Sequence, residues 1–315
     1  MASVLFLAYG LWEKDGRGKA DSFRFDAPPH LAWFARSVIL SLPHGKTLTL
    51  GSPIPLMGIV NVTPDSFSDG GAFATAAAAV EHGERLAAEG AAILDVGGES
   101  TRPRAEAVAA EEEMARAIPA VAELHRRVPQ PISIDTMKAR VAAAAVKAGA
   151  SIVNDVWGFQ RDPEMARVVA DTGAAAVLMH NRVHVDAGLD VIADILDFLS
   201  HSIDIALDAG VTRERLLVDP GFGFGKTPAQ NLELICRLRE LGALGCPILL
   251  GVSSKSTIGL LTGQKVAAER VAGSVAAGLM GVINGAAVLR VHDVAPHREA
   301  LQVLHAIEST ARARE

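Results

Sequence analysis

The sequence predicts an α/β fold, a (β/α)8 barrel of the TIM class with a short N-terminal extension. Eight apolar runs of strand length recur between residues 56 and 292, and helix-length stretches rich in Ala, Leu, Glu and Arg alternate with them. Near-continuous apolar runs are typical of parallel strands that helices cover. A single barrel of this class commonly takes about 250 residues, so a chain of 315 residues can form one. A doubly wound parallel sheet is the alternative arrangement of the same elements.

The elements follow one another in a regular order after an irregular start. Residues 1–45 show no clear hydrophobic period and are interpreted as an N-terminal extension, which leaves 46–315 as the barrel domain. The stretch 47–50 alternates polar and apolar residues, so we expect a strand that covers one end of the barrel. The barrel strands are predicted at 56–62, 91–97, 131–135, 151–156, 174–180, 215–220, 247–252 and 287–292. The helices are predicted at 74–89, 109–127, 137–147, 163–171, 192–209, 229–241, 267–284 and 298–311.

Helix boundaries support this assignment. Thr227-Pro228 and Asp162-Pro163 each combine a side chain that caps a helix N-terminus with a proline suited to the first helical position. Glycine just past a helix permits the left-handed conformation that ends many helices. Five predicted helix ends have such a glycine, namely Gly90, Gly149, Gly173, Gly210 and Gly285.

Composition excludes several classes of function. The net charge of -6 disfavours an electrostatic hold on nucleic acid or on an anionic membrane surface. The apolar stretch at residues 3–12 is too short to span a bilayer and lacks the features of a secretory signal, so we expect a cytoplasmic protein. Cys236 and Cys246 form neither a metal-binding pattern nor a disulfide framework and are expected to be reduced.

Polar residues follow the predicted strands, at the end of the barrel where enzymes of this class place their sites. Four of them, Asp135, Asn154, Asp219 and Lys255, combine acceptors and donors that suit a flat heterocycle with an amide edge. Met179 and the apolar wall would cover the face of such a ring. Any one of these residues could simply support the fold, but polar residues at all eight strand ends are difficult to explain in that way.

A second group of residues predicts an anion site. Arg290 and His292 are two residues apart on a strand, so both point to the same side. Asn61 is expected beside them once the barrel closes, and the turn at 253–258 leads into a helix. A diphosphate fits this combination, with Asp69 in the loop after the first strand as a candidate Mg²⁺ ligand beside Asn61.

The glycine-rich run at 221–226, GFGFGK, matches neither a dinucleotide fingerprint nor a phosphate-binding Walker loop. Its glycines permit close approach of the backbone. Phe222 and Phe224 either expose aromatic surface to a ligand or are core residues in a turn, and the sequence leaves both interpretations open.

Eight segments together resemble the dihydropteroate synthase family. They are NVTPDSFSDGG (61–71), DVGGESTRP (95–103), ISIDT (132–136), IVNDV (152–156), LMH (178–180), DPGFGFGK (219–226), GVSSKSTIG (251–259) and RVHDV (290–294). The resemblance extends from about residue 46 to 305, and its first and last segments are the most specific.

This resemblance implies a function and a set of residue roles. The family joins 6-hydroxymethyl-7,8-dihydropterin diphosphate to p-aminobenzoate in folate biosynthesis, uses Mg²⁺, is the target of sulfonamides and forms homodimers. The substrates are therefore expected to be small molecules. The roles implied for this chain are pterin binding by Asp135, Asn154, Met179, Asp219 and Lys255, diphosphate binding by Asn61, Thr101, Arg290 and His292, metal binding by Asn61 and Asp69, p-aminobenzoate binding by Phe224 and Ser256, and catalysis by Asp69, Arg102, Lys255, Arg290 and His292. The implied reaction is dissociative: diphosphate leaves before the arylamine attacks.

Two residues depart from the family pattern. Ser254 stands where the family usually has Arg, and Arg104 stands where it usually has Gly. Their effect on the second substrate or on sulfonamide sensitivity is open. Two other functions are alternatives: a pterin-binding methyltransferase domain, which would not need the diphosphate residues, and a non-catalytic paralogue in the folate pathway.

Overall fold

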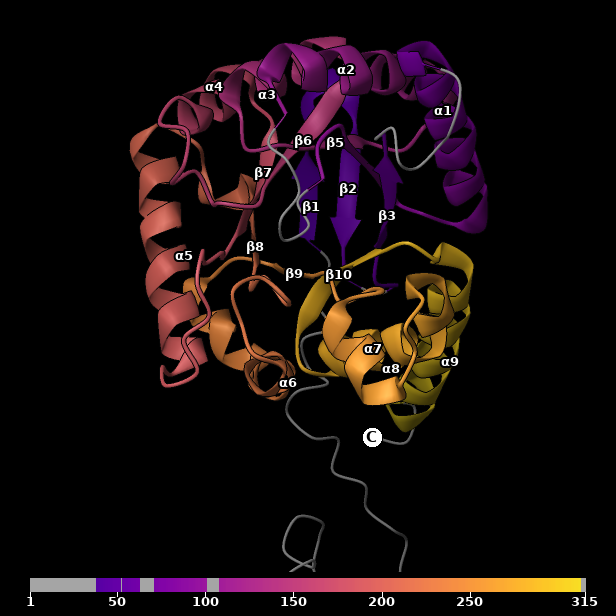
Figure 1. The fold of residues 1–315 in the computed structure, drawn as a ribbon, viewed down its shortest axis with the longest axis vertical. Helices are drawn as coiled ribbons and strands as arrows, with labels where there is room; N and C mark the ends of the chain where they lie inside the picture. The colour runs from indigo at the N-terminus through magenta and orange to yellow at the C-terminus, as the bar shows by residue number, and fades with distance from the viewer. Residues whose placement is uncertain (1–37, 52, 63–70, 101–107, 313–315) are drawn as a thin grey trace, which may run out of the picture.

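Eight parallel strands close into a barrel in the computed structural model, which describes residues 38–51, 53–62, 71–100 and 108–312, with backbone alone at 71–75 and 311–312. The order around the barrel is β10-β3-β4-β5-β6-β7-β8-β9 (Figure 1). The predicted (β/α)8 barrel is thus confirmed and the doubly wound sheet is wrong, because the last strand pairs with the first. The barrel strands are β3 (Leu56–Asn61), β4 (Ile93–Gly97), β5 (Ile132–Asp135), β6 (Ala150–Asp155), β7 (Ala175–Met179), β8 (Leu216–Asp219), β9 (Ile248–Leu250) and β10 (Ala286–Val291).

Helices form a ring outside the strands (Figure 1). Their apolar sides and the outward sides of the strands form one buried cluster, because each parallel strand is followed by a helix that packs back on the sheet. The helices are α1 (Gly71–Glu89), α2 (Ala110–Arg127), α3 (Ala139–Ala148), α4 (Met165–Thr172), α5 (Val191–Asp208), α6 (Pro228–Cys236), α7 (Ser256–Thr262), α8 (Val271–Ile283) and α9 (Val294–Arg312).

Two predicted helices are shorter than expected. The helix predicted at 229–241 ends at Cys236, and a 3-10 segment, η5 (Leu238–Leu244), follows and ends at Gly245, which has a φ of 67°. The helix predicted at 267–284 begins with a 3-10 turn, η6 (Ala267–Arg270). There the Arg270 guanidinium bonds the backbone oxygens of Gln264 and Lys265, which fixes a tight turn in place of regular helix.

The helix caps partly follow the prediction. Thr227 accepts a hydrogen bond from Gln230 N, and the Gln230 side chain accepts one from Thr227 N, so α6 begins with a complete capping box. Asp162 Oδ1 accepts from Glu164 N at 3.1 Å in the turn that leads into α4, although the regular helix begins only at Met165. Its Oδ2 also accepts from Ala139 N at the start of α3, at 2.8 Å. The glycines predicted to end helices all have positive φ, namely Gly90, Gly149, Gly173, Gly210 and Gly285.

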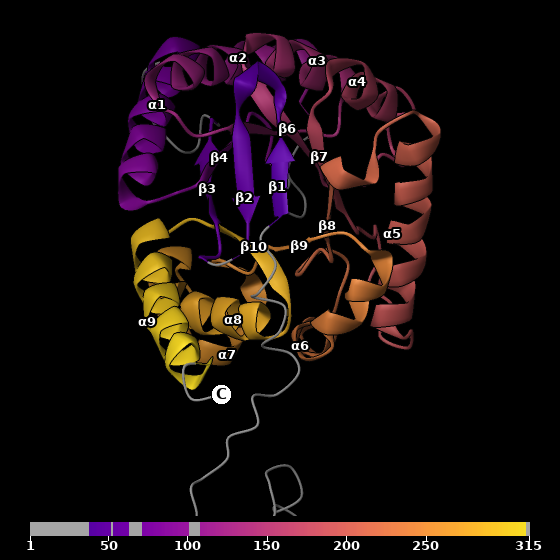
Figure 2. The same cartoon turned by 180° about the vertical axis from the view of Figure 1, so that it is seen from behind.

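A two-stranded antiparallel ribbon, β1 (Val38–Ser41) and β2 (Thr47–Leu50), lies across one end of the barrel (Figure 2). A short 3-10 turn, η2 (Pro43–Gly45), joins the two strands. The ribbon packs four leucines, Leu40, Leu42, Leu48 and Leu50, against side chains from the barrel interior such as Met57 and Ile152. The strand expected at 47–50 is therefore confirmed, and the amino ends of the barrel strands are covered. The domain boundary at residue 45 stays a prediction.

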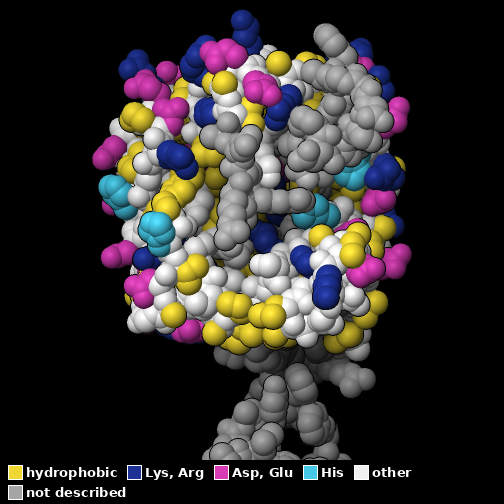
Figure 3. Space-filling view, viewed as in Figure 1, with side chains coloured by type: hydrophobic (Ala, Val, Ile, Leu, Met, Phe, Trp, Pro, Cys, Tyr) yellow, Lys and Arg dark blue, Asp and Glu magenta, His cyan; other side chains and the backbone are white. Residues whose placement is uncertain are grey.

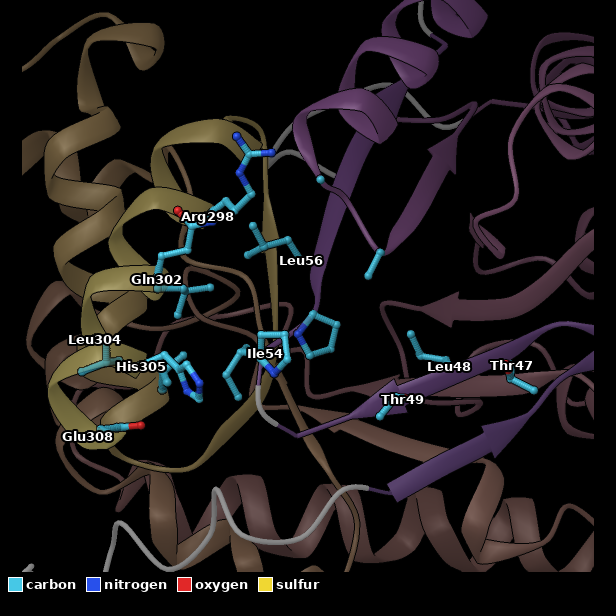
Figure 4. Close-up of a pocket in the computed structure, with 16 residues that line it drawn as sticks. Thr47, Leu48, Thr49, Ile54, Leu56, Arg298, Gln302, Leu304, His305 and Glu308 are labelled. Carbon is cyan, nitrogen blue, oxygen red and sulfur yellow. The ribbon is translucent and has the colours of Figure 1, made fainter. Parts of the chain in front are cut away.

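The covered end also has a cavity of about 510 Å³ between the start of β3 and α9 (Figure 4). Leu56 and Ile54 face Leu304 and His305 across it. This cavity lies away from the polar carboxyl ends of the strands, so its size does not identify the active site. In the described ranges no single helix has the length and apolarity of a membrane span, although α7 and the η6–α8 segment pass that test as a pair bent by 74°.

Candidate active site

Four side chains from separate strands meet at the carboxyl end of the barrel. Arg290 on β10 donates from Nε to Asp95 Oδ2 and from Nη2 to Asp135 Oδ2, each at 2.7 Å. Asn154 Nδ2 donates to the same oxygen of Asp95 at 3.0 Å. Asp95, Asp135 and Asn154 are all buried. Two carboxylates on β4 and β5 thus share one guanidinium from the opposite end of the sequence.

Asp95 is a site residue that the sequence analysis missed. It lies inside the run at 91–97, which was predicted only as an apolar strand and is observed as β4. A charge in the middle of a buried strand needs a partner, because an unpaired ion in a protein interior is costly. That signal was present in the sequence, although its partner Arg290 lies 195 residues away.

One guanidinium faces two carboxylates, so this cluster has more negative than positive charge. Burial raises the pKa of Asp135 to about 7; the Arg290 guanidinium opposes the shift, and the Asp95 carboxylate adds to it. Burial acts against the charge of Arg290, but the two carboxylates outweigh it and raise the pKa of that guanidinium above its ordinary value. Within the described part of the chain, Asp135 Oδ1 and Asp95 Oδ1 have no hydrogen-bond partner. The cluster can therefore accept further N–H donors.

A second polar pair lies on the other side, after β8 and β9. Asp219 Oδ1 accepts from Gly221 N at 2.7 Å, and burial raises the pKa of Asp219 against this bond and the charge of Lys255. Lys255 Nζ donates to Phe222 O at 2.9 Å and lies 4.1 Å from the centre of the Phe224 ring. Burial lowers the pKa of Lys255 to about 8, with Asp219 opposing the shift.

These residues line one small cup. Figure 1 places the strands that bear them around the barrel, and Figure 3, from the same side, shows Lys or Arg and His side chains near the middle of this face. The two phenylalanines of the glycine-rich run differ in their surroundings. Phe222 is 1% exposed and belongs to the core, whereas Phe224 is half-buried and presents part of its ring to the cup. The residues that line the cup are Asp135, Asn154, Val156, Met179, Asp219, Gly221, Phe222, Phe224, Gly251, Lys255 and Arg290.

Three further predicted residues lie around this cup without lining it. Asn61 is the last residue of β3 and pairs in register with Gly97. His292 follows β10; its backbone N–H donates to Ser253 Oγ at 3.2 Å, and its Nδ1 lies 3.1 Å from the same oxygen. Ser256 begins α7 and is exposed. The remaining predicted residues, Asp69, Thr101 and Arg102, lie outside the described residues.

The departure at Ser254 has a defined geometry. Ser254 has a φ of 58°, a left-handed conformation that is uncommon outside glycine. Its N–H donates to Ser274 Oγ at 2.9 Å, and its carbonyl accepts from Arg270 Nη1 at 2.8 Å. The turn before Lys255 is therefore held from α8 and η6 through the Ser254 backbone, and its side chain makes none of these bonds. Arg104 lies outside the described residues.

The comparisons with known proteins agree with this geometry. Residues 57–292 match the family of pterin binding enzymes. Dihydropteroate synthase from Clostridium beijerinckii is 46% identical over 82% of this chain and 96% of its own length. The enzyme from Bacillus subtilis is also 46% identical, over 76% of this chain and 83% of its own length. The chain belongs to the dihydropteroate synthase family.

Solved structures of dihydropteroate synthases extend this result to the fold. The Xanthomonas albilineans enzyme with 4-aminobenzoic acid is 49% identical, covers 87% of this chain and 99% of its own, and has a TM-score of 0.82. The same enzyme with 7,8-dihydropteroate covers 84% of this chain and 97% of its own, with a TM-score of 0.77. The predicted family, the transferase class and the dihydropteroate synthase function in folate biosynthesis are confirmed by these relatives.

Proposed function

We propose that the cup is the pterin subsite of this dihydropteroate synthase. One feature supports the assignment most strongly: the buried Asp135 carboxylate lines the cup and keeps one oxygen without a partner in the described part of the chain. An aminopyrimidine edge offers adjacent N–H donors, which a carboxylate can accept in pairs. Asp219 and Lys255 provide an acceptor and a donor across the cup, and the apolar side chain of Met179 packs on the ring face.

The diphosphate is proposed to lie above the pterin, toward β10 and β3. Arg290 uses Nε and Nη2 for the two carboxylates, so Nη1 is available to an anion. His292 is fixed by Ser253 beside it. Arg, His and Asn donors together can bind the oxygens of a leaving diphosphate and stabilise the charge that develops on it. Asn61, Arg290, His292 and Thr101 form this group, with Thr101 outside the described residues.

Magnesium fits this location by donor chemistry. In the described ranges there is no cluster of three or more His, Cys, Asp or Glu that could hold a metal ion. Mg²⁺ does not need one, because it usually keeps several waters and binds few protein oxygens together with substrate phosphates. The Asn61 amide oxygen at the end of β3 is such a donor, and Asp69 would complete the set. Bound there, the ion would neutralise charge on the diphosphate.

The proposed reaction needs no protein nucleophile. The bond between the pterin methylene and the diphosphate oxygen breaks, and diphosphate leaves with the bonding electrons. The cation that results is delocalised over the pterin and lies against Asp135 and Asp219. The amine of p-aminobenzoate, held near Phe224 and Ser256, then attacks the methylene carbon and loses a proton. Arg102 and Asp69 are proposed to assist diphosphate departure.

Diphosphate release tests this proposal. We expect release when the pterin diphosphate, p-aminobenzoate and Mg²⁺ are supplied together, and the variant Lys255→Ala should lose most of it. The control Lys147→Ala changes a lysine on the outer helix α3 and should leave the rate unchanged. If the wild-type chain binds the pterin but releases no diphosphate, the non-catalytic paralogue is the better description.

We further propose that the enzyme is a homodimer formed through α7, α8 and α9. Hydrophobic side chains appear at this corner of the surface in Figure 3. Six apolar side chains there are 49–69% exposed, and a second copy would remove them from water. They are Leu260, Leu261, Val266, Met280, Val303 and Ile307. The cytoplasmic location stays a prediction.

A further inference from the structure

We propose that Lys226 is a positioning residue for the p-aminobenzoate side of the site. Its ammonium fixes the loop at 221–225, and this loop in turn sets the position of Lys255 and Phe224. The inference rests on the proposed roles of those two residues. Lys226 does not line the cup, so it acts through its neighbours.

Lys226 makes three hydrogen bonds from a buried position. Its Nζ donates to Gly221 O at 2.9 Å, to Phe224 O at 3.1 Å and to His180 Nδ1 at 2.8 Å. The side chain is 7% exposed. Both carbonyls belong to the loop that leads to Lys226, so the ammonium closes that loop on itself. Burial lowers the pKa of Lys226 to about 7, with Asp219 opposing the shift, and in either protonation state the nitrogen can donate to these two carbonyls, which have turned inward.

His180 connects this ammonium to the outer helix α5. The Asp194 carboxylate only accepts, so the ring proton of His180 is on Nε2, which lies 2.9 Å from Asp194 Oδ2, and Nδ1 accepts from Lys226 Nζ. The other oxygen of Asp194 accepts from Arg182 Nη1 at 2.6 Å. Burial, with the charge of Lys226, lowers the pKa of His180 to about 3, so the ring is neutral at working pH. The loop is therefore tied to both β7 and α5.

Glycines let the loop lie directly against residues 180–182. Gly221 has a φ of 67°, and a Cβ there would lie 1.9 Å from His180 O. Gly225 has a φ of 60°, and its Cβ would lie 2.4 Å from Arg182 Cβ. The loop therefore packs closely on residues 180–182, and Gly221 O accepts both from Phe224 N at 3.0 Å and from Lys226 Nζ.

The loop controls one side of the cup more than the other. Phe222 O holds Lys255 Nζ, and the Phe224 ring lies beside the same ammonium. In contrast, Asp135 and Asn154 project from β5 and β6 and are fixed by Arg290 and Asp95. A displaced loop would therefore move the Lys255 and Phe224 side, and Asp219 through its bond to Gly221 N, while Asp135 and Asn154 would keep their geometry.

The variant Lys226→Met removes the three donors and keeps a side chain of similar length. Loss of a buried hydrogen-bond partner leaves acceptors unsatisfied, so we expect the KM for p-aminobenzoate to rise by about tenfold or more. The Kd of free hydroxymethylpterin, measured by calorimetric titration, should rise by a clearly smaller factor, because Asp135 and Asn154 are held by other residues and only Asp219 and Lys255 contact the loop. Lys226→Gln keeps one donor and should give an intermediate KM.

A matched control separates positioning from general destabilisation. Asn284 is a buried amide at the covered end of the barrel, where its Nδ2 donates to Ile235 O at 2.9 Å. Asn284→Ala should lower the thermal midpoint and leave the KM for p-aminobenzoate unchanged. An unchanged KM for p-aminobenzoate in Lys226→Met, or an equal loss of pterin binding, would overturn the inference. If that variant does not fold, the same two quantities are compared in Lys226→Gln. A wild-type chain without diphosphate release would instead overturn the proposed function.

Discussion

Asp135 and Asp95 lie close together, and a single guanidinium neutralises only one of their two charges. Burial raises the pKa of the Asp135 carboxyl to about 7, against the charge of Arg290, and the uncompensated carboxylate charge adds to the shift. Arg290 cannot lose its own proton under working conditions. The protonation state of the Asp95–Asp135–Arg290 group is thus set by Asp135 at near-neutral pH, where the proposed pterin site uses this carboxylate as an acceptor.

We predict that pterin affinity strengthens as pH rises through about 7, because Asp135 becomes a full acceptor only when it is ionised. Stability of the free protein changes in the opposite sense. The folded-state pKa of this carboxyl lies above the ordinary value of 3.8, so the native state binds more protons between these values and stability falls as pH rises across them. Calorimetric titration with hydroxymethylpterin from pH 5.5 to 8.5 checks the first part. A flat affinity profile would contradict it.

The variant Asp95→Asn should shift that midpoint downward. The Asp95 carboxylate contributes to the raised pKa of Asp135, and an amide of the same shape removes this contribution. The same variant weakens the hold on Arg290, so we expect pterin affinity above pH 8 to fall by about tenfold, as for a lost charged hydrogen bond. Asp171→Asn, on the exposed surface of α4, is the control and should change neither quantity. A midpoint that does not move would show that the two carboxylates are independent.

At the scale of elements, the sequence was informative where hydrophobic pattern decides the structure. Each of the eight predicted barrel strands overlaps an observed one, because a short apolar run between turn residues is typical of a buried strand. The breaks at η5 and η6 were not predictable in this way. They depend on Gly245 and on backbone bonds from Arg270, which helix periodicity does not reveal. The second bond of Asp162 was not predictable either, because its donor, Ala139 N, lies in another helix.

The capping box of α6 gives a prediction for one element. Thr227→Ala removes a side-chain oxygen that accepts from Gln230 N and should lower the free energy of unfolding by about 1 kcal/mol. Denaturant unfolding at fixed pH measures this difference. Ser200→Ala removes an exposed hydroxyl on α5 and should have little effect. Equal effects of the two changes would mean that the box does not stabilise the helix.

At the scale of the whole molecule, the exposed apolar side chains of α7–α9 predict self-association. Ile307 on α9 is 63% exposed, and Ile307→Asp would introduce a charge into the proposed interface. We expect the wild type to sediment as a dimer and this variant as a monomer, because unpaired charges are strongly disfavoured at buried interfaces. Leu207→Asp, on α5 at the other side of the ring, should leave the dimer intact (Figure 1). A monomeric wild type would disprove the proposed assembly.

The arrangement of the site was predictable only in part. Seven predicted residues line the cup, because closing eight strands brings their carboxyl ends together whatever their separation in sequence. The pairing within the cup was not predictable. The choice of Asp95 and Asp135 as partners for Arg290 depends on which side each residue of a strand faces in the closed barrel, and on side-chain length.

The ribbon of β1 and β2 closes the barrel at the amino ends of its strands. Its leucines fill the interior below the cup, so in the described part of the chain the cup opens toward the carboxyl ends of the strands. In the proposed arrangement the pterin lies deepest, so it must bind before p-aminobenzoate. The product that contains it can leave only after the diphosphate above it has left. The order of substrate binding then follows from the geometry: p-aminobenzoate that bound first would block the access of the pterin to its proposed subsite.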